Sequence, residues 1–206
     1  MSIKPILFNT EMVRAILDGR KTCTRRLVSS RQFLGMLPDK CKNAAPDEFL
    51  KGKRMMFKPY CDMTDAELIM TAYKAPYEPG DILYVRETWK KAPNGYYYYE
   101  DWQKDDIADV TKWKPSIHMP KEAARIWLKV TDVRVERLQE ITSEQISREG
   151  VEVEYPHVLN GEEKRYAFST LWNSTIKKSD LDRYGWNASP WVWVIEFERC
   201  VKPDGV

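Results

Sequence analysis

The sequence predicts a mixed α+β fold in which a small mixed β-barrel is flanked by short helices and carries two insertions. One observation is the nearly unbroken apolar run over residues 191–197, which is typical of a strand covered on both faces. A second is the alternating apolar pattern over residues 126–135, which changes parity near Thr131. The change predicts a bulge, which bends a strand around a barrel corner.

Local signals place the first two short helices. Thr10 is expected to cap a helix that runs to residue 17, and Gly19 supplies a left-handed stop. Thr142 and Gln145 form a capping box for a helix that ends at Gly150.

The remaining elements follow from periodicity and turns. Strands are expected over residues 22–28, 82–85 and 96–99, and a helix over residues 167–177. The total length of 206 residues favours a single domain over 1–206. The insertions cover about 29–76 and 101–113, where prolines, polar residues or mixed charge replace a regular pattern.

Composition excludes several classes of protein. No apolar run approaches the ~20 residues of a membrane span, and the N-terminus does not resemble a signal peptide, so we expect a cytoplasmic protein with no membrane partner. Four scattered cysteines and two histidines predict neither disulfides nor a metal site. No phosphate-binding glycine motif occurs, and no cofactor is expected.

The net charge of +2 conceals an asymmetry along the chain. Residues 19–58 carry eleven cations and three anions, so the rest of the chain is acidic. This distribution permits a polyanionic partner on one face.

The densest chemical segment is residues 19–26, Gly-Arg-Lys-Thr-Cys-Thr-Arg-Arg. Arginine binds phosphate oxygens bidentately, so the segment could form a phosphate site. The alternative is a solvated basic strand edge. A third interpretation is catalysis, because like charge lowers the pKa of a lysine and could make Lys21 a general base.

The same segment carries a resemblance to a known family. Together with the motifs at residues 5–8, 79–89, 116–120, 125–126, 133–138, 147–150 and 190–197, it resembles ASCH-domain proteins of the type common in bacteriophages and prophages. The resemblance implies a PUA-like barrel in the cytoplasm of a bacterial host. Its matches span nearly the whole chain apart from the two insertions.

Some small members of this family are amidohydrolases that deacetylate N4-acetylcytidine. Carried over by motif, the resemblance makes Lys21 the base, Thr24 the nucleophile and Glu149 the proton donor. In a regular strand Lys21 and Thr24 point to opposite faces. They converge only if Lys21 lies in the turn after Gly19, or if a bulge intervenes.

Other functions stay open. A non-catalytic module could bind a nucleoside or single-stranded nucleic acid, above all RNA, through Arg20, Arg25 and Arg26. The resemblance also permits a ribonuclease, which needs a metal or an acid–base pair. A phage interaction factor is a further alternative, although no residue argues for it.

Four more residues are candidates for substrate or nucleic-acid binding. Arg86 and Glu87 follow a strand and form either a structural pair or a phosphate or carboxylate site. His118, in a proline-bounded loop, is either structural or lines a pocket. Trp89 and the aromatic residues near the turns, Trp102, Trp113 and 96–99, are either stacking platforms for bases or hydrophobic lids.

Overall fold

A computed structural model describes residues 1–32, 64–102, 112–153 and 162–205. Most of the insertion at 29–76 and of that at 101–113 therefore lies outside the described residues, as do Cys41 and Cys61. The chain forms two compact units. Unit 1 comprises Met1–Thr22, Tyr77–Thr131 and Glu196–Val206, and unit 2 comprises Cys23–Pro76 and Asp132–Ile195.

Five strands form a mostly antiparallel sheet, so the fold is mixed α+β as predicted. Their hydrogen-bonded order is β1 (Ile3–Leu7), β3 (Ile82–Arg86), β6 (Trp127–Arg137), β7 (Trp191–Cys200) and β2 (Cys23–Leu27). β1 and β3 pair in parallel, and β3 and β6 pair antiparallel. This order has two ends, so the hydrogen bonds of the described strands do not close the predicted barrel.

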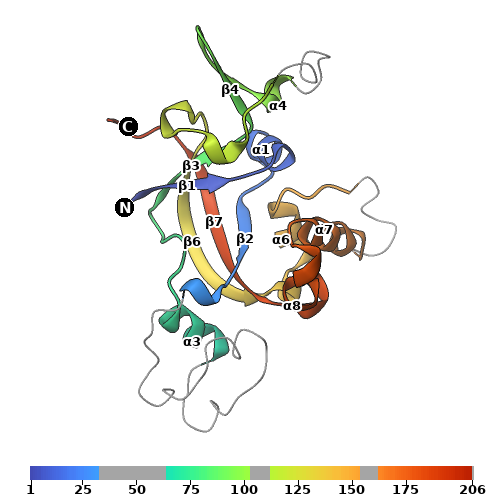
Figure 1. The fold of residues 1–206 in the computed structure, drawn as a ribbon. Coiled ribbons are helices and arrows are strands. Elements are labelled where there is room, and N and C mark those ends of the chain that lie inside the picture. The colour runs from blue at the N-terminus through green and yellow to red at the C-terminus, as the bar shows by residue number, and fades with distance from the viewer. Residues whose placement is uncertain (33–63, 103–111, 154–161, 206) are drawn as a thin grey trace. The chain divides into compact units, whose positions relative to one another are not determined.

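Unit 1 contains α1 (Thr10–Leu17), whose position agrees with the predicted helix (Figure 1). Its N-cap is Asn9 and not Thr10, because the Asn9 side chain accepts the backbone N–H of Met12 at 2.9 Å. Gly19 has φ +76°, which is the predicted left-handed stop.

A two-stranded ribbon and a short helix complete unit 1. β4 (Trp89–Ala92) pairs with β5 (Gly95–Tyr98), and α4 (Tyr99–Trp102) follows at once. β4 was not predicted, because only its Trp89 is fully buried and the strand shows no apolar alternation. One buried apolar cluster of the unit comprises Ile82, Trp89, Met119, Ala123, Ala124 and Trp127. The short 3-10 helices η3 (Ser116–His118) and η4 (Lys121–Ala123) lead into β6.

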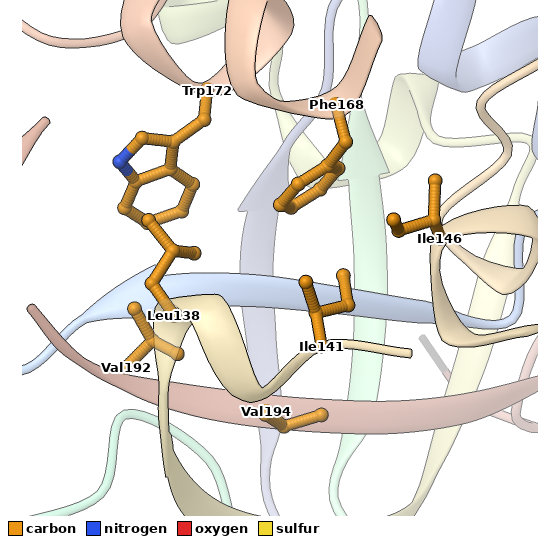
Figure 2. Close-up of a cluster of buried hydrophobic side chains, with 7 residues drawn as sticks. All are labelled: Leu138, Ile141, Ile146, Phe168, Trp172, Val192 and Val194. Carbon is orange, nitrogen blue, oxygen red and sulfur yellow. The ribbon is translucent and has the colours of Figure 1, made fainter. Parts of the chain in front are cut away.

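Unit 2 is held together by an apolar cluster between its helices and strands. α6 (Ser143–Arg148) and α7 (Glu162–Ser174) pack together, and η5 (Leu138–Glu140) contributes to the same core. Figure 2 shows these side chains converging: Leu138, Ile141, Ile146, Phe168, Trp172, Val192 and Val194. Burying each of the larger ones contributes roughly 1.5–3 kcal/mol.

The helices of unit 2 confirm some predictions and correct others. The capping box of Thr142 and Gln145 is present in α6. α7 begins at Glu162, before the predicted start at residue 167, because its first turn is polar and the apolar stripe appears only later. α3 (Asp65–Ala72), capped by Thr64, lies inside the stretch predicted to be irregular. The remaining short elements are η1 (Ser30–Gln32), η6 (Lys178–Asp180), α8 (Leu181–Tyr184) and η7 (Trp186–Ala188).

The parity change in β6 is confirmed by burial. Before residue 131 the even-numbered Leu128 and Val130 are buried, and after it the odd-numbered Val133 and Val135 are buried. None of the helices in the described part of the chain has the length and apolar character that crossing a bilayer requires.

Candidate functional site

Lys21 lies between α1 and β2, at a β-bridge position two residues before β2 begins. The backbone N–H groups of Arg20 and Lys21 both donate to the carbonyl oxygen of Ala15 at 2.9 Å, which fixes the turn after Gly19. Lys21 is 2% exposed, and its Nζ lies 5.5 Å from the centroid of the Phe8 ring. Lys21 therefore lies beyond the turn at Asp18 and Gly19, and its convergence with Thr24 stays a prediction.

Arg25 is the centre of a buried polar cluster in unit 2. Its Nη1 donates to Glu149 Oε1 at 3.1 Å, and its Nη2 donates to Glu136 Oε2 at 3.1 Å and to Gln145 Oε1 at 3.2 Å. The guanidinium is almost wholly shielded from solvent. Its Nε–H is also buried and has no hydrogen-bond partner among the described residues. Two carboxylates therefore neutralise the charge of Arg25, and the ion pairs with them hold its guanidinium in place.

The helix α6 brings two of these acceptors to Arg25. Gln145 and Glu149 are four residues apart, so they lie on the same face of the helix and its C-cap. The capping box holds the Gln145 side chain, because Gln145 Oε1 also accepts the backbone N–H of Thr142 at 2.9 Å. Cys23 Sγ lies 3.9 Å from the carbonyl oxygen of Gln145, so alternate residues of β2 face α6.

Thr24 has the opposite parity on β2. It is 1% exposed, and its Oγ1 accepts a hydrogen bond from Arg26 Nη1 at 3.1 Å. Residues two apart on a strand share a face, so Thr24 and Arg26 form a pair separate from the Arg25 cluster. Within the described residues, no hydrogen bond joins Thr24 to Glu149.

The burial of this segment decides one of the open alternatives. Lys21, Thr24 and Arg25 are buried, so the segment is not the solvated basic strand edge that was one interpretation. Arg20 differs, since it is partly exposed and pairs with Asp18 at 2.8 Å. Arg25 is occupied by protein acceptors, which leaves Arg20 and Arg26 as the cations of the segment with exposed surface.

A second polar cluster lies in unit 1, at the end of β3. Glu87 is 2% exposed and accepts two hydrogen bonds from Arg125, both at 2.9 Å. Arg125 also donates to both carboxylate oxygens of Asp101, at 2.7 and 2.8 Å, and its guanidinium carbon lies 4.1 Å from the centroid of the Tyr98 ring. Burial raises the pKa of Glu87, although Arg125 opposes the rise.

Replacing Arg125 with methionine is expected to lower the free energy of unfolding by about 3 kcal/mol at pH 7, because Glu87 then stays buried without its partner. The loss is expected to be smaller at pH 5. A carboxyl with a raised native pKa gains stability as it takes up a proton, and loses it as the pH rises. Urea unfolding at both pH values measures the difference. Asp101→Asn is the control: it removes only the more exposed partner of Arg125 and should cost less than about 1 kcal/mol.

The other predicted binding residues, Arg86, Trp89 and His118, each lie in a different environment. Arg86 Nε donates to the carbonyl oxygen of Met119 at 2.8 Å, so the partner of Glu87 is Arg125 and not the adjacent Arg86. Trp89 is buried in unit 1, and within the part of the chain that the structure describes its indole N–H has no hydrogen-bond partner. His118 is exposed in η3.

Sequence reasoning missed several members of both clusters. Gln145 was recognised only as a helix cap, Arg125 and Glu136 only as members of the matching stretches 125–126 and 133–138, and Asp101 gave no signal beyond ordinary charge. The partners of Arg25 lie 111 to 124 residues away in the sequence, so no local pattern could connect them. Across the described residues, no group of three or more histidine, cysteine, aspartate or glutamate side chains is arranged to hold a metal ion.

Comparison with known proteins gives only weak similarities. No family model matches the sequence, and no curated protein matches it. Among solved structures, the chain is similar to an ASCH domain from Lactobacillus crispatus, with a TM-score of 0.39 and 11% identity over 96% of this chain and 79% of that chain. It is also similar to a hypothetical protein, PH0355, with a TM-score of 0.37 and 16% identity over 97% of this chain and 100% of that chain. Inferences about function therefore depend on the chain's own residues.

Proposed function

We propose that this chain is an ASCH-type, PUA-like protein that handles a nucleoside or nucleic acid, and that it hydrolyses a small amide on a modified nucleoside such as N4-acetylcytidine. We also propose that the protein acts in the cytoplasm of a bacterial host and is encoded by a phage or prophage, as the resemblance implies. The supporting observation is burial: Lys21, Thr24 and Glu149 are 2%, 1% and 5% exposed.

Burial matters because polar groups are costly to remove from water unless an interaction compensates for it. On a solvated basic strand the polar side chains remain in water. Sites that transfer protons, in contrast, commonly bury lysine, threonine and glutamate side chains. The structure also gives Thr24 a cationic neighbour, since Arg26 Nη1 donates to its hydroxyl oxygen. A positive charge at this oxygen favours the alkoxide character that a threonine nucleophile needs.

In the proposed reaction the Thr24 hydroxyl gives its proton to a base, the role that the resemblance assigns to Lys21, and the threonine oxygen attacks the acetyl carbonyl carbon. The carbon–nitrogen bond breaks as Glu149, in its protonated form, donates a proton to the departing N4 nitrogen, which releases cytidine. Water, deprotonated by the Glu149 carboxylate, then attacks the acetyl-threonine ester and releases acetic acid as the base returns its proton to Thr24. The net change is the consumption of one water molecule. Arg25, which holds Glu149 at 3.1 Å, acts as a positioning residue for that carboxyl.

The test is deacetylation of N4-acetylcytidine, followed by chromatography of the cytidine formed. Lys21→Ala and Glu149→Gln are expected to lower kcat about 100-fold or more, and Thr24→Val to abolish turnover, because each removes a proton-transfer group or the nucleophile.

Two controls separate chemistry from folding. Thr24→Ser keeps the hydroxyl and is expected to retain measurable turnover, which a purely structural role for Thr24 would not require. Lys129→Ala removes an exposed lysine and should leave turnover unchanged. Absence of turnover in the wild-type protein, or equal turnover in Thr24→Val, would contradict the proposal for this substrate.

A further inference from the structure

The ion pairs of Arg25 continue along β6 in a series of alternating charges. Asp132, Arg134 and Glu136 are two residues apart on this strand, so their side chains lie on the same face of it. Arg134 donates from Nε to Glu136 Oε1 at 2.6 Å and from Nη1 to Asp132 Oδ2 at 2.9 Å. All of these residues belong to unit 2, as does Arg25. Glu136 therefore connects Arg25 to a second arginine.

The two carboxylate oxygens of Glu136 accept from different arginines. Oε1 accepts from Arg134, and Oε2 accepts from Arg25 Nη2 at 3.1 Å. A carboxylate held at both oxygens cannot rotate without breaking one of two charge-assisted hydrogen bonds. β7 lies between β6 and β2 in the sheet, so the pair of Glu136 with Arg25 also spans a strand. Arg134 thus fixes Glu136, and Glu136 fixes one side of the Arg25 guanidinium.

The exposure of the side chains falls steadily along the series. It is 51% for Asp132, 32% for Arg134, 18% for Glu136 and 1% for Arg25. Ion pairs become stronger as water is excluded from them, so the innermost pair is held more firmly than the outermost. A change at Arg134 or Glu136 therefore acts on Arg25 from the more exposed end of the series.

Arg25 divides one positive charge between two carboxylates. Its Nη2 serves Glu136, and its Nη1 donates to Glu149 Oε1 at 3.1 Å. A guanidinium forms its best pair with a carboxylate when two parallel N–H groups meet both oxygens. Without the charge of Glu136, Arg25 would be free to turn towards Glu149 and move its carboxyl. Glu136 therefore opposes a rearrangement of Arg25 and Glu149.

We propose that Glu136 is a positioning residue for Glu149 and that it acts through Arg25. The proposal rests on the proposed hydrolase, in which Glu149 transfers protons. A proton donor must stay within hydrogen-bonding distance of the reacting atom, and a displacement of about 1 Å can lower the rate about 100-fold. Glu136 does not touch the substrate in this scheme. Its effect is to keep the Glu149 carboxyl where Arg25 Nη1 holds it.

Steady-state hydrolysis of N4-acetylcytidine by Glu136→Gln tests the proposal, because glutamine keeps the shape of the side chain and removes its charge. We expect kcat to fall about tenfold and KM to change less than about twofold, since the substrate still binds while the proton donor is displaced. Arg134→Met should lower kcat about threefold, because it loosens Glu136 from one side only. Glu198→Gln is the matched control: Glu198 is an exposed glutamate on β7 in unit 1, paired with Lys129, and its loss should leave kcat unchanged.

Nuclear magnetic resonance of the arginine side chains gives a second measurement that needs no turnover. Carboxylates on both Nη groups hinder rotation of the guanidinium, so the wild-type Arg25 should show separate Nη1 and Nη2 signals. In Glu136→Gln these signals should merge or broaden, because one carboxylate is lost. Urea unfolding establishes that each variant is folded, and Arg134→Met provides both measurements if Glu136→Gln does not fold.

The two measurements separate this proposal from the hydrolase itself. If the wild type releases cytidine, an unchanged kcat in Glu136→Gln, or a fall caused by KM alone, would overturn the positioning role. If the wild type releases none, the hydrolase fails for this substrate, and the Arg25 signals decide: unchanged signals in Glu136→Gln would overturn the role, and merged signals would support it.

Discussion

An Arg25→Met variant is expected to lose about 4 kcal/mol of unfolding free energy, since methionine fills most of the space but removes the cation from two acceptor carboxylates. Arg25 is almost wholly shielded from solvent, and so is Glu149, while Glu136 is only slightly exposed. A charge left in such surroundings without its partner is expensive, whereas the same pair at the surface contributes little. Urea unfolding followed by tryptophan fluorescence measures the loss.

Two comparison variants test whether the loss of unfolding free energy comes from the buried ion pairs of Arg25. Arg20→Met removes a partly exposed arginine, also paired to an aspartate, and should cost less than about 1 kcal/mol. The double variant Arg25→Met/Glu149→Leu should be more stable than Arg25→Met, because it replaces both buried charges with apolar groups. An Arg25→Met variant as stable as Arg20→Met would show that the cluster does not hold unit 2 together.

An Asp81→Ala variant is expected to lose about 4 kcal/mol, because charge-assisted hydrogen bonds contribute roughly 1.5–3 kcal/mol each and several are lost together. The Asp81 carboxylate accepts the backbone N–H and hydroxyl of Ser2 at 2.9 and 2.7 Å, Lys4 Nζ at 2.7 Å and the backbone N–H of Glu78 at 3.0 Å. These bonds join the start of β1 to the turn before β3. Without the carboxylate, two backbone N–H groups lose their acceptor.

Asp81 also predicts a dependence on pH. Burial alone raises the pKa of Asp81, but the hydrogen bonds from Lys4 and Ser2 outweigh burial and hold the pKa well below its usual range. A carboxyl with a lowered native pKa contributes stability above its unfolded pKa of about 3.9, and that stability is lost as the pH falls further. The difference in unfolding free energy between wild type and Asp81→Asn should therefore shrink between pH 5 and pH 2. Asp132→Asn, at a position where the side chain is about half exposed, should show no such change.

Local sequence signals predicted most elements, because their causes are local. Gly19 ends α1 through its own backbone conformation, and the Thr142 capping box begins α6 with residues three apart. The parity change in β6 follows from the two-residue period of a strand. β1, β4, α3, α4 and α8 were not predicted. In β4 and α3 charged or mixed residues conceal the period, and there pairing or capping decides the structure.

The candidate site was predicted only as a set of residue types. The Gly-Arg-Lys-Thr-Cys-Thr-Arg-Arg segment identified where polar chemistry is concentrated, but not which cations meet solvent. Arg20 and Arg25 look alike in that segment, yet Arg20 pairs with a residue two positions away and Arg25 with carboxylates more than a hundred positions away. The aromatic residues near the turns gave two interpretations: Trp89 belongs to a buried apolar cluster, whereas Tyr97 and Trp102 are partly exposed, and base stacking stays a prediction.

By itself, then, the sequence determined the mixed α+β class, the limits of most helices and strands, and the basic segment that carries the candidate chemistry. Tertiary structure alone decided that Lys21, Thr24 and Arg25 are buried, and that Glu136, Gln145 and Glu149 surround Arg25. The physical reason is the range of the interactions. Capping, turns and strand alternation act over a few residues, whereas the burial of a charge depends on which distant partners the fold brings within hydrogen-bonding distance.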